Sequence, residues 1–243
     1  MSLKCLQTIA LAILKTSRML LSHVIRAKTC VTMRAMNQMT PAPRIGAAHW
    51  LIGLNVLAFV LQWSDQRSAM QWFALWPLNL GSLAESPDLF ELWQIFTSAF
   101  LHGSIMHLAF NMLGLWMFGR EVEAAFGTRR FLVLYFVSVL TASFCQLLTM
   151  ALVEEFVPTI GASGGVMGIL LAFAMLYPKR IIVLLIPPIP LPAWLFVPLF
   201  ALVELFLGLS GKQSGVAHFA HLGGMLGSLV LTRYWLRKRR RVT

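Results

Sequence analysis

The chain has 243 residues, of which 58% are hydrophobic and 12% are charged, and its mean hydropathy is +0.75. Soluble domains carry about 25% charged residues, so this composition excludes an ordinary soluble domain and indicates an integral membrane protein. The net charge of +11 comes from basic residues between and beyond the apolar stretches. This pattern is typical of membrane orientation and argues against nucleic-acid binding.

Residues 1–44 form a basic arm that contains no acidic side chain. The arm is compatible with an amphipathic surface helix, with a mitochondrial-type presequence, and with a translated leader upstream of a later start at Met36 or Met39. Lys15 and Arg18 limit its apolar stretch, which argues against a classical secretory signal. We therefore place the arm outside the membrane domain.

Six apolar segments follow the arm, and we interpret residues 45–236 as one all-α membrane domain with six transmembrane helices. The segments are Ile45–Trp63, Ser104–Phe126, Phe131–Leu152, Ser163–Tyr177, Ala193–Leu209 and Val216–Leu236. All of the 20 Lys and Arg residues except Arg67 and Lys212 fall on the N-terminal side of the membrane. The positive-inside rule makes that side cytoplasmic, and the even span number places both termini there. The basic tail, 237–243, suits anionic lipid headgroups.

Two connections between these segments have unusual compositions. Residues 64–103 are too apolar for a free loop, and we expect an interfacial structure in the outer leaflet with Trp72, Trp76 and Trp93 at headgroup depth. The run LLIPPIPLP cannot form a continuous helix because proline removes a donor and clashes with the preceding turn. We expect an irregular or re-entrant inner connection there.

The fourth segment is short and opens with Ser163 inside GASGG. A helix of this length rises only ~22 Å, whereas the hydrocarbon core is ~30 Å thick. Because Lys179 and Arg180 fix its inner end at the cytoplasmic surface, Ser163 must lie below the outer surface. Irregular backbone at that depth is tolerated only around a protein-lined or water-filled cavity.

The sixth segment places His221 at the same depth, ~22 Å above its basic tail. Small residues that allow two helices to approach closely recur on both segments: Gly164 and Gly168, and Ala220, Gly224 and Ser228. Such glycines and serines also serve packing alone, but an intramembrane histidine is costly and usually functional. GASGG matches the G-x-S-x-G elbow of α/β-hydrolases as well, but no alternating strand–helix pattern surrounds it.

In the second segment His107 and Asn111 are four residues apart and share one helical face. Serine hydrolysis develops negative charge on the carbonyl oxygen, which these side chains and the backbone N–H of Ser163 could stabilise. A purely structural hydrogen bond between helices is the alternative for Asn111.

Four motifs together resemble the rhomboid family of intramembrane serine proteases, over Ile45 to Leu236. They are GASGG, AHLGG, HGSIMHLAFN and GREVEAAFG, the last with Gly119, Glu123 and Gly127 in the family's G-x-x-x-E-x-x-x-G spacing. The resemblance implies a six-helix bundle, no cofactor, no metal, and cleavage of transmembrane protein substrates near a helix end.

The same resemblance assigns roles to individual residues. It implies that Ser163 is the nucleophile and His221 the general base, with Asn111 and His107 as oxyanion donors. Gly161 and Gly164 would belong to the loop that frames the site, and His102 would be structural. The family's outer Trp-Arg pair is replaced by Trp93-Gln94, which puts the stability of that loop in question, and Met167 replaces an aromatic residue beside the histidine.

These motifs contain no Asp or Glu expected to hydrogen-bond and orient the histidine, so the sequence predicts a Ser-His dyad. His218 is the rival base, and Glu204, an ionisable residue within the fifth segment, has no assigned role. Substrates are expected to enter from the lipid past the fifth helix, which Pro198 weakens.

The function predicted from the sequence is intramembrane serine proteolysis. The alternatives are a non-catalytic rhomboid-like protein that binds membrane clients, a small transporter, and a metal site built from His102, His107, His218 and His221. A bacterial inner membrane is the expected location, with the mitochondrial inner membrane as the alternative because of the basic arm.

Overall fold

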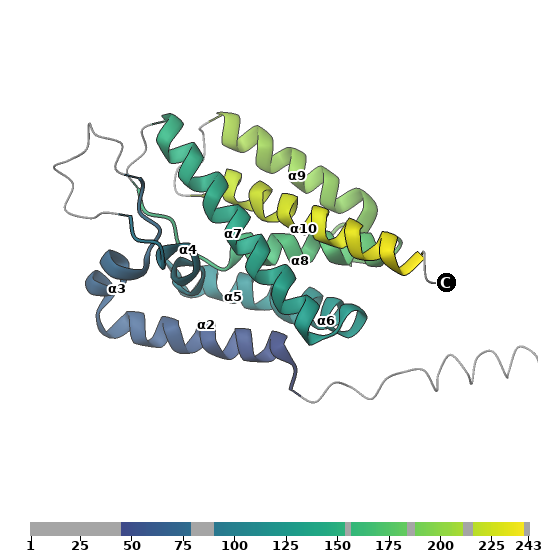
Figure 1. Cartoon of the computed structure of the whole chain (residues 1–243), viewed down its shortest axis with the longest axis horizontal. Helices are drawn as coiled ribbons and strands as arrows, with labels where there is room; N and C mark the ends of the chain where they lie inside the picture. Colours follow the sequence, from purple (N-terminus) through teal and green to yellow (C-terminus); the bar gives the residue numbers. More distant parts are fainter. Residues whose placement is uncertain (1–44, 79–89, 154–156, 184–187, 211–215, 241–243) are drawn as a thin grey trace, which may run out of the picture. The chain divides into compact units, whose positions relative to one another are not determined.

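The structure is a computed structural model that describes residues 45–78, 90–153, 157–183, 188–210 and 216–240. Apart from one strand pair, its elements are helices (Figure 1). They are α2 (Ala47–Ser64), α3 (Gln66–Phe73), α4 (Gln94–Thr97), η1 (Ser98–Phe100), α5 (Ile105–Gly114), η2 (Leu115–Gly119), α6 (Arg120–Phe126), α7 (Thr128–Val153), α8 (Ser163–Leu176), β1 (Ile181–Val183), β2 (Pro190–Pro192), α9 (Ala193–Ser210) and α10 (His218–Arg240).

A helix, or a continuous run of helical turns, overlaps each of the six predicted segments, and α7 and α10 extend beyond theirs. In the part of the chain that the structure describes, three helices are individually long and apolar enough to cross a membrane: α2, α7 and α9. The second segment is the run α5–η2–α6, and α8 is a shorter apolar helix. The mostly helical membrane fold is thus confirmed, whereas the count of six crossings stays a prediction.

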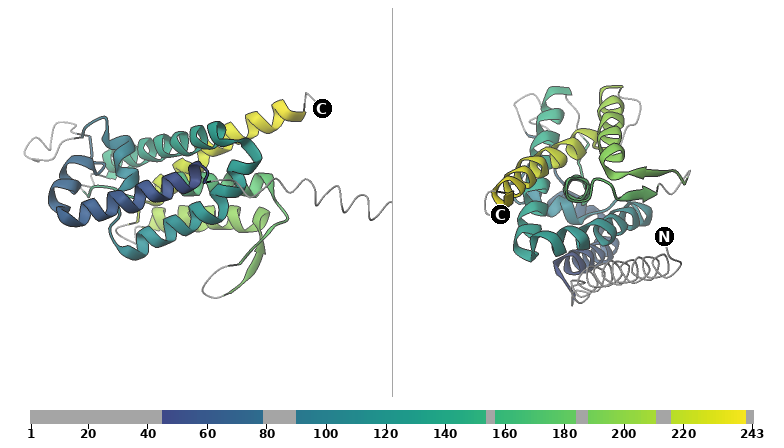
Figure 2. Two further views of the ribbon diagram at one scale, coloured as in Figure 1. Left: turned by 90° about the horizontal axis from the view of Figure 1, so that it is seen from below. Right: turned by 90° about the vertical axis from the view of Figure 1, so that its right-hand side faces the viewer.

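The short helix α8 lies at the centre of the helices (Figure 2, right). Nine of its 14 residues are buried, and the core around it includes Phe131, Leu134 and Tyr135 of α7. A Cβ atom on Gly165 would lie 2.5 Å from the ring of Tyr135, so only glycine fits at this crossing. The small residues of the fourth segment therefore let its neighbours close around it.

The GREVEAAFG motif fixes the start of α2. Both carboxylate oxygens of Glu123 accept hydrogen bonds from the backbone at this helix N-terminus, from Ala47 N (2.8 Å) and Ala48 N (3.0 Å). The negative charge also complements the positive end of the helix dipole. Gly127 ends α6 with φ +81°, a conformation that favours glycine. The motif thus joins α6 to the first predicted span.

The connection between α2 and α5, which the sequence predicts on the outer side, contains α3, α4 and η1, while residues 79–89 lie outside the described part. Gln94 is buried, and its side-chain oxygen accepts hydrogen bonds from Trp76 N and Glu91 N, both at 3.2 Å. Trp72 and Trp93 are exposed, and the indole of Trp93 donates to the carbonyl of Trp72 at 2.9 Å. These two hydrogen bonds to Gln94 hold the backbone of the connection whose stability the replacement of arginine put in question.

The proline-rich inner connection differs from the irregular structure expected. Strands β1 and β2 pair antiparallel, with Ile181 opposite Pro192 and Val183 opposite Pro190 (Figure 2, left). Proline is compatible with this ladder because a two-stranded pair has open edges, where no N–H is required. Residues 184–187 lie outside the described part.

The described part begins at Ile45 and ends at Arg240. The arm, residues 1–44, lies outside the described residues, as do residues 241–243. Helix α10 continues to Arg240, so most of the predicted tail extends the last helix.

Candidate active site

Ser163 is the first residue of α8, directly after a turn at Gly161. Gly161 has φ +125°, and its N–H donates to the carbonyl of Ser98 at 2.9 Å. A Cβ at this position would lie 2.8 Å from the ring of His107, so both the conformation and the space favour glycine. The turn delivers the serine hydroxyl to the N-terminus of a central helix.

His221 is on α10, which packs directly against α8. A Cβ on Gly224 would overlap the carbonyl oxygen of Gly164, and the hydroxyl of Ser228 donates to the carbonyl of Gly168 at 2.6 Å. The close approach predicted from the small residues is therefore confirmed. Across this contact, Nε2 of His221 lies 2.9 Å from Oγ of Ser163.

The serine and the histidine open onto a cavity of about 560 Å³. His107 and Asn111 line the same cavity from α5, together with Met167 from α8. The side-chain amide of Asn111 donates one hydrogen bond to the carbonyl of His107 at 3.0 Å, and an amide nitrogen carries two hydrogens. The structure thus gathers Ser163, His221, His107 and Asn111 around one space.

Glu204 adds a group that the sequence reasoning did not use. Its Oε2 atom lies 2.9 Å from Nδ1 of His221 and 2.7 Å from Nδ1 of His218. All three side chains are buried. Its position as an ionisable residue inside an apolar segment already indicated a functional or structural role. Its partners become apparent only from the packing of α9 on α10.

The candidate metal ligands predicted from the sequence do not form one cluster. The ring of His102 packs edge-on against His107 at 5.0 Å, whereas His218 and His221 meet Glu204. The ligand atoms of Glu204, His218 and His221 lie within 4.8 Å of one another, a donor set that could hold a cation. Tetrahedral zinc ligands stand about 3.3 Å apart, so the 2.7 and 2.9 Å separations fit hydrogen bonds better.

His102 is buried before α5, where its backbone is held by one side chain. Gln62 of α2 accepts from His102 N at 3.0 Å and donates to His102 O at 2.9 Å. The ring also packs against Phe59. These contacts fit the structural role that the resemblance implied.

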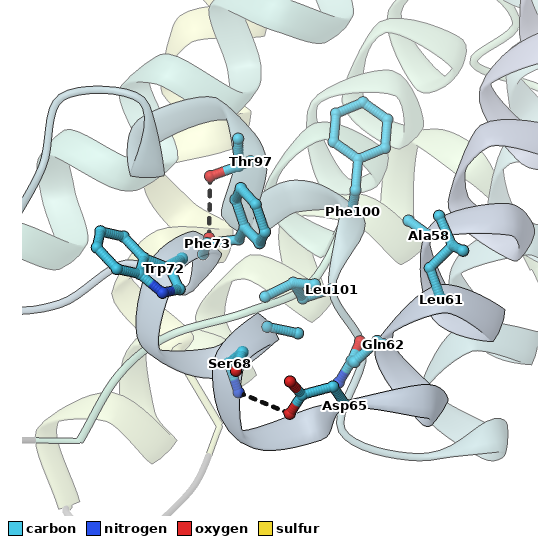
Figure 3. Close-up of a pocket in the computed structure, with 11 residues that line it drawn as sticks. Ala58, Leu61, Gln62, Asp65, Ser68, Trp72, Phe73, Thr97, Phe100 and Leu101 are labelled. Atoms are coloured by element: carbon cyan, nitrogen blue, oxygen red, sulfur yellow. Dashed lines mark hydrogen bonds between the residues drawn. The ribbon is translucent and has the colours of Figure 1, made fainter.

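A second pocket, of about 380 Å³, lies between α2, α3 and the α4–η1 turn (Figure 3). Its lining is largely apolar, with Trp72 and Phe73 on one side. Asp65 accepts a hydrogen bond from Ser68 N at 3.1 Å, and bonds from Ser68 hold the pKa of Asp65 below its usual range. Asp65 and Ser68, the polar pair in this pocket, form the N-terminal cap of α3, which is a structural role.

Comparisons with known proteins agree with the motifs. Residues 89–238 match the family model of the rhomboid domain. The chain is 35% identical over 138 residues to "Rhomboid protein 1, mitochondrial" of Saccharomyces cerevisiae, covering 56% of the chain and 40% of that protein. It is 30% identical over 139 residues to "Rhomboid protease GluP" of Bacillus subtilis, covering 56% of the chain and 25% of that protein. The match spans less than half of either relative.

Proposed function

The chain belongs to the rhomboid family, and we propose that it is an intramembrane serine endopeptidase that hydrolyses peptide bonds of transmembrane protein substrates. The observation that carries this proposal is the 2.9 Å contact between Oγ of Ser163 and Nε2 of His221 at the wall of a cavity. A similar protein from Bacillus subtilis is named a rhomboid protease, which supports proteolysis.

The proposed chemistry begins with transfer of the Ser163 hydroxyl proton to the neutral His221 ring as the oxygen attacks the substrate carbonyl. The ring then protonates the leaving amine, which gives an acyl-enzyme. Water, deprotonated by the same ring, attacks the ester carbon and releases the carboxylic acid product and Ser163. Each proton that His221 accepts is returned, so the cycle leaves the enzyme unchanged.

The oxyanion of each tetrahedral intermediate needs donors that are already in place. We assign this role to Asn111 and His107, which line the cavity from α5, and to the backbone N–H of Ser163 at the start of α8. The N–H of Gly161 is engaged with Ser98, so it is not assigned. Removing one such donor typically costs about 10²–10³ in kcat.

The proposed topology has six transmembrane crossings with both termini in the cytoplasm. Arg180, which follows α8, lies 3.7 Å from Glu121 in the first turn of α6, which supports placing this turn and the end of α8 on the same side of the membrane. The basic termini are proposed to bind anionic lipid. We propose a bacterial inner membrane, and the mitochondrial inner membrane is the alternative that the yeast relative's name supports.

The direct test incubates detergent-purified protein with a model single-span substrate, with wild type beside Ser163→Ala and His221→Ala. We expect cleavage by wild type and none by either variant, with substrate binding retained in all three. Equal cleavage by Ser163→Ala would refute the assignment. Binding without cleavage in wild type would instead identify a non-catalytic client-binding protein.

A further inference from the structure

We propose that Glu204 is a positioning residue, which fixes His221 in the tautomer able to deprotonate Ser163. This inference rests on the proposed protease function. It extends the predicted Ser-His dyad to three hydrogen-bonded side chains, Ser163, His221 and Glu204, each from a different helix. Ser163 comes from α8, His221 from α10 and Glu204 from α9. None of the four motifs contains Glu204.

The direction of the hydrogen bonds follows from the chemistry of the groups. An ionised carboxylate only accepts hydrogen bonds, so Nδ1 of His221 and Nδ1 of His218 both carry hydrogen where they meet Oε2 of Glu204. A neutral imidazole has one N–H, which leaves Nε2 of His221 without a hydrogen. That atom lies 2.9 Å from Oγ of Ser163 and can accept the hydroxyl proton.

The electrostatic benefit extends through the reaction. When His221 takes the proton it becomes a cation in a buried site, and an isolated buried charge is costly. The carboxylate of Glu204 lies 2.9 Å away and compensates this charge. A neutral amide in its place can either donate or accept, so it would select the tautomer less strictly and would not compensate the imidazolium charge.

His218 serves the carboxylate rather than the serine. Its Nδ1 is bound to Glu204, and among the described residues its buried Nε2 has no hydrogen-bond partner. The contact with Ser163 belongs to His221. The geometry therefore makes His218 an anchor for Glu204 and argues against the rival assignment of His218 as the base.

The packing of α9 gives independent support, because this helix buries little else. Only Ala193, Val197 and Glu204 are buried among its 18 residues, while apolar side chains such as Leu202 and Phe206 are exposed. A helix whose lipid-facing side is apolar has no packing need for an acid on its inner face. The carboxylate is explained by the two histidines that it meets.

The test compares wild type with Glu204→Gln and Glu204→Asp, measuring kcat, KM and the melting temperature on one model substrate. Glutamine keeps the size but can donate to Nδ1, which favours the wrong tautomer. We expect kcat to fall about 100-fold in Glu204→Gln with KM within about twofold, and aspartate to restore at least about tenfold. Ser228→Ala is the matched control, because it removes a buried α8–α10 hydrogen bond away from the cavity.

A second readout follows the proton itself. Nitrogen-15 spectra of histidine-labelled protein, assigned with His221→Ala, report which ring nitrogen carries hydrogen. We expect Nδ1–H in wild type and a mixture of tautomers in Glu204→Gln. An Nδ1–H tautomer that persists unchanged in Glu204→Gln, or a kcat that equals wild type, would overturn the inference. So would a loss of kcat no greater than that of a Ser228→Ala protein with the same melting temperature.

Two controls separate this inference from its alternatives. If wild type cleaves, Ser163→Ala does not, and Glu204→Gln matches wild type, the positioning role fails while the protease stands. If wild type never cleaves, the protease proposal fails and the nitrogen spectra alone decide the hydrogen bond. Activity that is lost on chelation with EDTA and regained with zinc would overturn the inference in favour of a metal site.

Discussion

The contact between α8 and α10 differs sharply from the contact of α9 with the same helices. At the first, glycine lies against backbone: a Cβ on Gly224 would overlap the carbonyl oxygen of Gly164, and one on Gly168 would lie 2.9 Å from the carbonyl oxygen of Gly224. Helix α9 (Figure 1), by contrast, has three buried residues among its 18, and Pro198 lies inside it. The two contacts serve one site in different ways.

The tight α8–α10 contact suits rigid placement of the reacting side chains, whereas the loose packing of α9 suits entry of the substrate. The proposed nucleophile and base sit on the closely packed pair, where an error of 1 Å between reacting groups would be costly. The helix expected to admit substrate is the loosely packed one, and Glu204 is its polar link to the base. Displacement of α9 would therefore release His221 from Glu204.

The largest effect is expected from a methyl group placed between α8 and α10. Gly224→Ala should destabilise the protein by about 3 kcal/mol and abolish activity, because its Cβ meets backbone that cannot move aside. Thermal unfolding in detergent measures the change. The control is Gly53→Ala on α2, where a Cβ meets nothing within 4 Å, and we expect it to stabilise by about 0.5–1 kcal/mol. Equal melting temperatures would contradict this packing.

A smaller loss is expected from the hydroxyl that joins the same two helices. Ser228→Ala removes the 2.6 Å bond to the carbonyl of Gly168 and should cost about 1 kcal/mol, with kcat close to wild type. The free energy of unfolding and kcat are measured on the same preparation. A large fall in kcat without any loss of stability would mean that α10 is aligned by this bond rather than by the glycines.

The role of α9 in access predicts a kinetic effect rather than a loss of stability. Pro198→Ala restores a backbone donor and should strengthen α9. We expect cleavage of a transmembrane substrate to slow about threefold while labelling by a small fluorophosphonate is unchanged. Cleavage and labelling rates are compared in the same detergent. Parallel changes in both rates would show that the helix affects chemistry rather than access.

The smallest effect is expected on the lipid-facing side of α9. Leu202 is 63% exposed, and Leu202→Ala should change the free energy of unfolding by less than about 0.5 kcal/mol. It also serves as a matched control for the proline variant on the same helix. A loss of 2 kcal/mol or more, of the size typical for a buried leucine, would reveal a packing partner for this face.

Much of the site could be predicted because depth and spacing are local properties of the sequence. The basic residues that end the fourth and the sixth segments placed Ser163 and His221 at one level, and the structure brings them to 2.9 Å. The small residues on both segments predicted the close approach for the same reason. The helix period and the length of a segment can be obtained from the sequence without knowing which helices lie beside it.

The features that were missed depend on contacts between distant parts of the chain. Glu204 meets His218 and His221 only through the packing of α9, 14 and 17 residues away in sequence. The replacement of arginine by Gln94 put the stability of the outer connection in question, yet the buried amide oxygen of Gln94 accepts two backbone hydrogen bonds there. The β1–β2 pair was missed because its prolines predicted irregular backbone. In a two-stranded pair, a residue on the open edge needs no N–H donor, so proline is accepted there.

The most direct test of the central claim is covalent labelling of the purified protein with a fluorophosphonate, with the modified peptide mapped by mass spectrometry. We expect one label, on Ser163, that is formed by wild type and lost in His221→Ala. A label on another residue, or unchanged labelling of Ser163 in His221→Ala, would contradict the assignment of these two side chains as nucleophile and base.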